Sequence, residues 1–387
     1  MAIRIPEYLR TQRERREQSG SNRTLRLNGG GADLSSNDYL GIAKRLATPL
    51  SVSKVLEGAH FSGVGATGSR LVSGNFDAHE ELELFLASYH QAESALLFGS
   101  GYEANIGLLS SVAGRSDTIL FDELIHASMR DGIRLSYAKA LSFRHNDLDD
   151  LKKKAALARG DIFIAVESLY SMDGDLAPLV ELCQLARELG AFLIVDEAHS
   201  NGVYGPKGAG LVSELGLNDR IFARVNTFGK ALGYKGACVL GSRELRQHLI
   251  NHARSFIYAT APDLVTLKFM AEAYRLNEQS DGDRANLSNL ISEFKKQSAR
   301  FDSLQFLPSD SQIQGVIVSG NLEALRAEKA LNEAGIIARA IRAPTVPAGT
   351  ERIRFCIHSF NSVSDLIFAL EVLDSSTHGA RSGVLNE

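Results

Sequence analysis

Short runs of apolar residues alternate with stretches of helical periodicity through the central part of the chain. The helical stretches carry apolar residues three and four positions apart, as at Leu82, Phe85, Leu86 and Tyr89. The apolar runs have the length of strands and occupy Ser94–Phe98, Thr118–Phe121, Ala140–Phe143, Ile162–Glu167, Ala191–Asp196, Ile221–Asn226 and Lys235–Leu240. Because strands that alternate with helices form βαβ units, we predict an α/β fold with a large, mostly parallel seven-stranded sheet.

Two regions flank this central part. Residues 1–37 are predicted to form an N-terminal arm, with a charged helix over Pro6–Gln18. Residues 38–275 form the large domain. After a polar run, residues 276–387 have the order of elements expected for a small α+β domain. We expect helices at Leu287–Arg300, Leu322–Ala334 and Val363–Leu373, and strands at Gln314–Val318, Ile336–Arg342 and Arg352–Ile357.

Composition narrows the class of protein. The 387 residues carry a formal net charge of −4, so no basic excess indicates a nucleic-acid partner. No apolar run approaches the roughly 18 residues that span a bilayer, and the charged N-terminus lacks the apolar core of a signal peptide, so we expect no membrane partner. Cys183, Cys238 and Cys356 lie far apart, as is typical of reduced thiols in a cytoplasmic protein.

Three short motifs point to other chemistry and are set aside. Gly63–Gly68 matches GxGxxG, but neither the preceding strand nor the following acidic residue of a dinucleotide site is present. Asp196–His199 spells DEAH, but the phosphate-binding GxxxxGK[ST] of such ATPases is missing. His248 and His252 lie four apart without an obvious third ligand, so we expect a solvated helix face and no metal site.

Polar residues follow the ends of several predicted strands. Asp196 ends one strand and His199 follows three residues later, Ser171 comes after the preceding strand, and Lys230 comes after the next one. A fourth strand leads into Gly99–Asn105, whose amides and helix start can bind an anion. The carboxyl ends of parallel strands are where α/β proteins bind ligands. Each residue alone also has a structural explanation, such as a helix cap at Asp196.

Pyridoxal 5′-phosphate (PLP) requires this combination of groups. It needs a lysine for covalent attachment, an aspartate that keeps the ring nitrogen protonated, and a helix start for the phosphate. His126 follows a further strand end and is suitably placed in the sequence to stack on the ring.

The sequence resembles the α-oxoamine synthases, which are fold-type I enzymes that use PLP. The resemblance runs from about Asp33 to Ile357. It rests on Ser36–Gly41, Gly65–Gly74, and the segments around Ser171, Asp196–His199 and Lys230. By resemblance, the chain is an active PLP-dependent acyltransferase, although an inactive homologue that serves as a binding subunit stays open.

The resemblance also implies roles for individual residues. Lys230 corresponds to the cofactor-bound lysine, Asp196 to the partner of the ring nitrogen and His199 to the donor to the ring hydroxyl oxygen. His126 corresponds to the stacking residue. The other implied cofactor contacts are Ser171, Thr227, the phosphate-binding pair Gly101 and Tyr102, and Thr260. Thr260 matches a segment that reaches the phosphate of the neighbouring subunit, which implies a homodimer with shared active sites.

Members of the family join an amino acid to an acyl thioester and differ in both substrates. The segments Gly68–Gly74 and Ile341–Arg354 resemble the members that use L-alanine and a pimeloyl thioester, carried by CoA or by acyl carrier protein. By this resemblance Arg354 binds the amino-acid carboxylate with support from Asn37, and Arg342, Thr345 and Arg23 lie near the acyl substrate. Use of glycine with acetyl-CoA, or of serine with a long acyl chain, remains an alternative.

Overall fold

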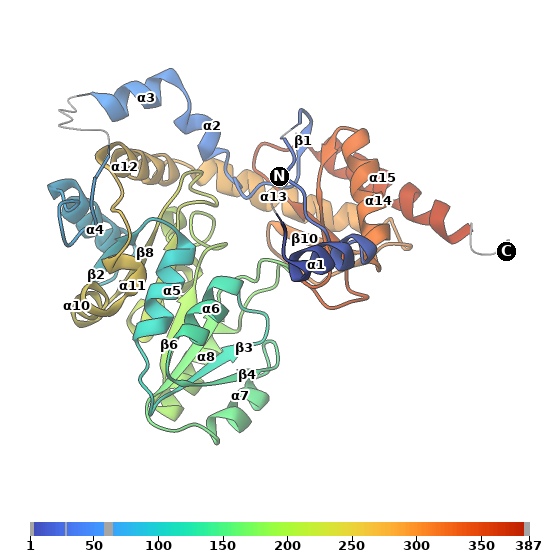
Figure 1. Cartoon of the computed structure of the whole chain (residues 1–387). Coiled ribbons are helices and arrows are strands. Elements are labelled where there is room, and N and C mark those ends of the chain that lie inside the picture. Colours follow the sequence, from blue (N-terminus) through green and yellow to red (C-terminus); the bar gives the residue numbers. More distant parts are fainter. Residues whose placement is uncertain (1–3, 28, 58–64, 383–387) are drawn as a thin grey trace. The chain divides into compact units, whose positions relative to one another are not determined.

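The computed structural model describes residues 4–27, 29–57 and 65–382 and divides into two compact units (Figure 1). The larger unit comprises Asn37–Ser171 and Leu176–Ala285. The smaller unit comprises the described chain up to Ser36, the short segment Met172–Asp175, and the described chain from Asn286 onward. The domain boundaries expected at residues 37 and 275 stay a prediction, because compactness alone does not show which segments fold independently.

The larger unit is built on a seven-stranded sheet with the order β2-β8-β7-β6-β5-β3-β4. Its strands are β2 (Ser94–Phe98), β3 (Thr118–Asp122), β4 (Lys139–Phe143), β5 (Ile162–Glu167), β6 (Phe192–Asp196), β7 (Ala223–Thr227) and β8 (Ala237–Gly241). The strands from β7 to β4 pair in parallel, whereas β8 runs antiparallel to both of its neighbours. The predicted α/β fold with a mostly parallel seven-stranded sheet is confirmed.

Helices of the larger unit precede the first strand of the sheet, separate most of the strands and follow the last one. They are α2 (Ile42–Leu46), α3 (Pro49–Leu56), α4 (Asp77–Tyr89), α5 (Gly101–Ser111), α6 (Ala127–Leu135), α7 (Leu148–Ala155), α8 (Leu179–Leu189), α9 (Leu211–Glu214), α10 (Arg243–His252), α11 (Arg254–Ile257) and α12 (Leu264–Glu278). Two short 3₁₀ turns lie at Pro206–Gly208 and Asn218–Arg220. Side chains cap several starts: Ser100 accepts from the amide of Glu103, and Asp263 from that of Thr266.

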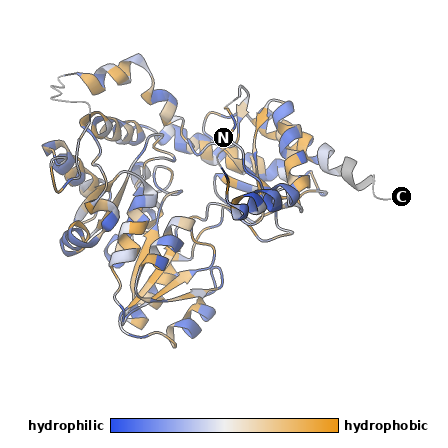
Figure 2. Ribbon diagram, in the orientation of Figure 1, coloured by the Kyte–Doolittle hydropathy of each residue, from blue (hydrophilic) through white to orange (hydrophobic). Residues whose placement is uncertain are grey.

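Most strands of the sheet are buried. Every residue of β2 is buried, although the outer strand β4 is partly exposed, and Figure 2 shows hydrophobic residues concentrated on the large sheet. Fully buried strand residues include Leu96 on the edge strand β2, and Ile164, Ile194 and Val225 on central strands. Continuous apolar strands of this kind are what a parallel sheet covered on both faces requires. Among the described residues, no helix has the length and apolar character needed to cross a membrane.

The smaller unit contains a four-stranded antiparallel sheet in the order β12-β13-β10-β9. Its strands are β9 (Gln305–Phe306), β10 (Ile313–Ile317), β12 (Arg339–Ile341) and β13 (Arg352–Cys356), and a parallel pair joins β1 (Ala32–Asp33) to β11 (Ile336–Ile337). The helices are α1 (Glu7–Gln18), α14 (Asn321–Glu333) and α15 (Val363–Ser382), while α13 (Asp281–Ser298) begins in the larger unit.

Two predicted elements of the smaller unit differ from the structure. The strand expected over Ile336–Arg342 is divided, because β11 pairs with β1 while β12 pairs with β13. The last helix continues to Ser382, past its expected end at Leu373, since no proline or glycine interrupts the chain before Gly379.

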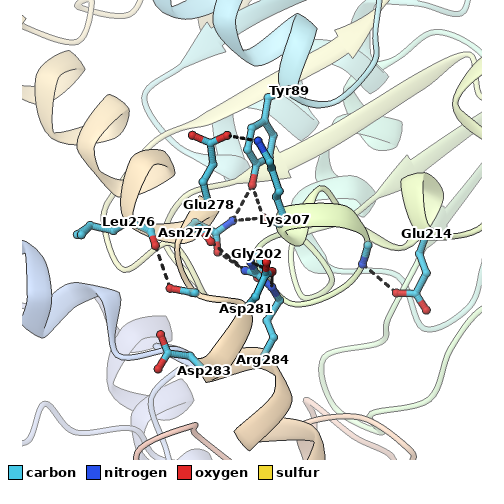
Figure 3. A network of polar contacts seen from close by, with 12 residues as sticks. Tyr89, Gly202, Lys207, Glu214, Leu276, Asn277, Glu278, Asp281, Asp283 and Arg284 are labelled. Carbon is cyan, nitrogen blue, oxygen red and sulfur yellow. Dashed lines mark hydrogen bonds and ion pairs between the residues drawn. The ribbon is translucent and has the colours of Figure 1, made fainter.

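A polar network holds the loop that follows β6 (Figure 3). The Arg284 guanidinium donates to the carbonyl of Gly202 at 3.1 Å and to the carbonyl of Asn277 at 3.0 Å. The Asn277 amide donates to the Tyr89 hydroxyl at 2.9 Å and to the carbonyl of Lys207 at 3.1 Å. Gly202 has a φ of +90°, which a side chain would strain. The loop that begins at Asp196 is therefore fixed at its far end.

Candidate active site

A cavity of about 340 Å³ lies in the larger unit, where the carboxyl ends of β5, β6 and β7 meet the start of α5. The residues that line it are Gly99, Ser100, Gly101, Tyr102, Asn105, His126, Ser128, Glu167, Asp196, Ala198, His199, Thr227, Gly229, Lys230, Tyr234, Lys235 and Gly236. The structure thus brings together seven predicted site residues, namely Gly101, Tyr102, His126, Asp196, His199, Thr227 and Lys230.

Asp196 is the buried acid of this cavity. It is 4% exposed, and its carboxylate accepts hydrogen bonds from the Asn105 amide at 2.7 Å and from the backbone N–H of Ala198 at 2.8 Å. Burial raises the pKa of Asp196, while these hydrogen bonds and the charges of His126 and Lys230 act in the opposite direction. A buried carboxylate of this kind is stabilised by a cation placed in the cavity.

Glu167 is a second buried acid, which the sequence analysis did not identify. It lies beside Asp196 in the β5–β6 pairing and is 3% exposed. Burial and then the charge of Asp196 raise its pKa well above the usual value, which favours the protonated form of Glu167. Its Oε1 atom has no hydrogen-bond partner among the described residues. The acidic residue at the end of an apolar strand was the available signal.

The two cavity histidines have different hydrogen-bond partners. His126 Nδ1 accepts from the backbone N–H of Ser128 at 3.2 Å, which places the ring hydrogen of the neutral form on Nε2. Burial lowers the pKa of His126 and favours that neutral form. His199 Nδ1 lies 2.7 Å from the hydroxyl of Tyr39, a residue within the Ser36–Gly41 motif. Tyr39 is fully buried and also donates to Asn37 Oδ1 at 3.1 Å.

The start of α5 and the end of β7 approach closely. A Cβ atom on Gly101 would lie 2.4 Å from Thr227 Cγ2, so only glycine fits. The Thr227 hydroxyl is buried and without a hydrogen-bond partner among the described residues. An unpaired hydroxyl beside a helix start is suited to an anionic group. Lys230, Asp196, the helix start and the orphaned Thr227 and Glu167 oxygens together fit PLP.

Two predicted cofactor residues lie outside the cavity lining. Ser171 is buried in the loop after β5, and its backbone N–H donates to the Glu167 carboxyl. Thr260 is exposed between α11 and α12. Its expected role toward a partner subunit stays a prediction.

The predicted substrate residues are divided between the units. Asn37 belongs to the larger unit, whereas Arg354 is half-buried on β13 of the smaller unit. Its neighbour Arg352 is buried and forms an ion pair with Asp173. Because residues two apart on a strand share a face, Arg352 and Arg354 extend from the same face of β13.

Three predicted acyl-site residues come together in the smaller unit. Arg23 donates to the Thr345 hydroxyl at 2.8 Å, and Arg342 donates to the carbonyl of Asn22 at 3.1 Å. Burial lowers the pKa of Arg342, and the charges of Arg26 and Arg23 add to that effect. This part of the smaller unit is electropositive.

The structure also shows what surrounds the three motifs that the sequence analysis set aside. The His248 and His252 rings stack 4.5 Å apart, and no cluster of three or more metal-ligating side chains occurs in the part of the chain that the structure describes. Glu197 of the DEAH tetrapeptide is buried and accepts from the backbone N–H of Val212. Gly63 and Val64 of the GxGxxG match lie outside the described residues.

Comparison with known proteins identifies a matching family model and similar proteins. The family model described as Aminotransferase class I and II matches residues 30–370. An 8-amino-7-oxononanoate synthase from Emericella nidulans is 39% identical over 95% of each chain. Another from Alkalilimnicola ehrlichii is 42% identical over 87% of this chain and 86% of its own.

Solved structures match nearly the whole fold. A serine palmitoyltransferase from S. paucimobilis with a bound PLP–myriocin aldimine has a TM-score of 0.87 at 26% identity and covers 98% of each chain. The 8-amino-7-oxononanoate synthase of Francisella tularensis has a TM-score of 0.77 at 29% identity, covering 91% of this chain and 99% of its own.

Proposed function

Because this chain belongs to the class I and II aminotransferase family, and within it to the PLP-dependent α-oxoamine synthases, we propose that it acts as an 8-amino-7-oxononanoate synthase. It would join L-alanine to pimeloyl-CoA, or to the pimeloyl thioester of acyl carrier protein, and release carbon dioxide and the thiol carrier. This is a carbon-building step of biotin biosynthesis. The relatives of about 40% identity that bear this name support the choice of substrates.

The observation that carries the proposal is the convergence of Lys230 and Asp196 in one cavity. In it, Lys230 would hold PLP covalently, Asp196 would face the ring nitrogen, and Gly101 and Tyr102 would bind the phosphate with Thr227. His126 would stack on the ring, with Ser171 as a further contact. When bound, PLP supplies an electron-withdrawing ring that accepts charge from the α-carbon of the amino acid.

Lys230 then acts on protons at the substrate. Its amine removes the α-proton of alanine, and the α-carbon attacks the thioester carbonyl as the carbon–sulfur bond breaks. The thiolate leaves, the carboxylate departs as carbon dioxide, and a proton returns to the same carbon. Asp196 assists by staying ionised in a dry site, where its hydrogen bond from Asn105 favours the charged form.

Tyr39 orients the ring of His199. Its hydroxyl donates its one hydrogen to Asn37 Oδ1 at 3.1 Å, so at the 2.7 Å contact its oxygen is the acceptor for His199 Nδ1. Held in this orientation in the cavity lining, His199 would present Nε2 to a ring oxygen of the cofactor.

The substrate roles follow the family resemblance. Arg354 would bind the carboxylate of alanine through two parallel hydrogen bonds, supported by Asn37. Arg342, Arg23 and Thr345 would lie near the acyl group, and the contact between Arg23 and Thr345 supports treating them as one site. Thr260 would reach the phosphate in a second subunit, which makes a homodimer with shared sites part of the proposal. Cys183, Cys238 and Cys356 are buried and form no disulfide among the described residues, which fits a cytoplasmic location.

A serine palmitoyltransferase activity is the second candidate, favoured by the TM-score of 0.87.

Two measurements test the proposal. Borohydride reduction followed by peptide mapping is expected to place the reduced cofactor on Lys230, and a label on a different lysine would refute the site. Incubation of alanine with pimeloyl-CoA is expected to give a product with the mass of 8-amino-7-oxononanoate. A product only from serine with palmitoyl-CoA would favour the second candidate.

A further inference from the structure

Lys235 lines the same cavity, five positions after Lys230, and has no place in the proposed chemistry. It lies just before β8, which pairs antiparallel with β2 so that Ala237 is opposite Phe98. Continuing that register, Gly236 comes opposite Gly99, and Lys235 comes opposite Ser100. A Cβ atom on Gly236 would lie 3.4 Å from the Phe98 carbonyl oxygen, which agrees with this placement. Lys235 is therefore beside the loop that begins α5.

The charges in this loop favour an additional cation. The Glu103 carboxylate accepts from the backbone N–H of Gly99 at 3.0 Å, and the Ser100 side chain accepts from the N–H of Glu103 at 3.2 Å. The N–H groups of Gly99 and Glu103 are thus already used within the protein. A phosphate monoester brings nearly two negative charges near neutral pH, whereas a helix start offers only about half a positive charge.

The described residues that line the cavity contain only two ammonium groups, Lys230 and Lys235. His126 is neutral by the pKa argument above, and Lys230 is used in the link to the cofactor. Lys235 is exposed, and among the described residues no carboxylate lies within 4.0 Å of its ammonium group. The nearby Asp263 accepts from the backbone N–H and hydroxyl of Thr266, at 2.9 and 2.8 Å, and the charge of Lys235 contributes to the lowered pKa of Asp263 without forming an ion pair.

We propose that Lys235 is a phosphate-binding residue of the cofactor site, which offsets the charge of the phosphate group beside the start of α5. This inference rests on the proposed PLP chemistry and adds to it a cationic partner for the phosphate. It distinguishes Lys235 from Lys230, since Lys235 would contribute through charge at the phosphate and not through covalent chemistry at the ring.

The test compares PLP with pyridoxal, which has the same aldehyde and ring but no phosphate. Dissociation constants of both are measured by absorbance titration of the cofactor-free full-length protein. For Lys235→Gln we expect PLP to bind about tenfold more weakly, because a hydrogen bond to a charged group is lost, while pyridoxal binds as in the wild type. Lys235→Arg should keep most of the PLP affinity. Lys329→Gln, on exposed α14, is the matched control and should change neither constant.

The dependence of the PLP dissociation constant on ionic strength provides a second test. Raising the ionic strength should weaken PLP binding in the wild type more than in Lys235→Gln, since screening acts on the charge that the variant lacks. Equal loss of PLP and pyridoxal in Lys235→Gln, or no loss of either, would overturn the role of Lys235. If the wild type binds neither compound and borohydride labels no Lys230, the proposed function itself fails.

Discussion

The Asn105 side chain, on the first turns of α5, donates a 2.7 Å hydrogen bond to the Asp196 carboxylate at the end of β6. Asn105 is 2% exposed and also donates to the Ser128 hydroxyl at 3.0 Å. Asn105 thus connects α5 with Asp196 and with the start of α6. A hydrogen bond to a buried carboxylate favours its charged form, which is the form that the proposed chemistry uses.

Removing the charge of Asp196 should abolish most of the activity and leave the fold intact. Asp196→Asn keeps the size and the polar surroundings of the side chain, but a neutral amide cannot hold a ring nitrogen protonated. We expect turnover to fall on the order of a hundredfold or more. Steady-state rates, with circular dichroism as the check on folding, measure this. Turnover near that of the wild type would show that Asp196 serves only as a structural acceptor.

Loss of the Asn105 hydrogen bond should move the pH dependence of the reaction. In Asn105→Ala the ionised form of Asp196 loses a donor, so its pKa rises further. The acid limb of the profile of kcat/KM against pH is therefore expected to shift toward higher pH. Ser111→Ala on the same helix is the control, since among the described residues the Ser111 hydroxyl donates only to carbonyls of α5. A uniform drop in rate without a shifted limb would contradict this account.

The contact between Gly101 and Thr227 predicts a compensating pair of substitutions. Gly101→Ala places a methyl group 2.4 Å from Thr227 Cγ2, so we expect much weaker PLP binding. Thr227→Ser removes that Cγ2 atom and keeps the hydroxyl, so the double variant should regain most of the affinity. Gly282→Ala, which meets no atom within 4 Å, is the control. If the double variant does not regain affinity, the contact with Thr227 Cγ2 is not the cause of the weaker PLP binding.

His79 makes the stability of the protein depend on pH. His79 is fully buried, and burial together with the charge of Arg70 lowers its pKa to about 4. Unfolding restores the ordinary pKa, so at about pH 5 the unfolded chain binds a proton that the folded chain does not. The free energy of unfolding therefore has its full value above the pKa of His79 in the unfolded chain. It decreases as the pH falls from that value toward the pKa of His79 in the folded chain.

His79→Gln should therefore reduce the proton uptake on unfolding near pH 5 by about one proton. Calorimetry in two buffers of different ionisation enthalpy measures the uptake. Glutamine can still accept from the backbone N–H of Phe76, as His79 Nδ1 does at 3.2 Å. Asn251→Gln, at the exposed surface of α10, is the comparison and should leave the uptake as in the wild type, because neither side chain titrates. Equal uptake in His79→Gln and wild type would show that His79 is not buried neutral.

The sequence predicts those features that local patterns encode. The apolar runs that end at Asp196 and before Lys230 locate strands, and strand ends in an α/β sheet are where ligands bind. The antiparallel direction of β8 could not be predicted, because the hydrophobic pattern of a strand is the same in either direction. Glu167 ends an apolar strand as Asp196 does, but it was missed because it lies outside the motifs that carry the family resemblance.

Contacts distant in sequence were also beyond reach without a family resemblance. Arg23 and Thr345 are separated by 322 positions, and no periodicity connects them. The ion pair between Arg352 and Asp173 likewise depends on Met172–Asp175 packing with the smaller unit. Local patterns determine elements, whereas such pairs depend on how the whole chain folds back on itself.

Substrate choice is tested at Arg354. Arg354→Lys keeps the positive charge but loses the two parallel hydrogen bonds that align a planar carboxylate, so KM for alanine should rise about ten- to a hundredfold. KM for the pimeloyl thioester should change little. Arg339→Lys, on the neighbouring strand and directly opposite Arg354, is the control. A larger increase in KM for the thioester than for alanine would show that Arg354 belongs to the acyl site and not to the amino-acid site.

The wild type should prefer L-alanine to glycine and serine, and a pimeloyl to an acetyl or palmitoyl thioester. One methyl group in a pocket discriminates by only about 1–3 kcal/mol, so some turnover of glycine is compatible with the proposal. Specificity constants for each pair of substrates, measured under one set of conditions, decide the matter. A clear preference for glycine with acetyl-CoA, or for serine with palmitoyl-CoA, would overturn the named activity. It would leave the family assignment unchanged, because the roles proposed for Lys230 and Asp196 are common to all of these reactions.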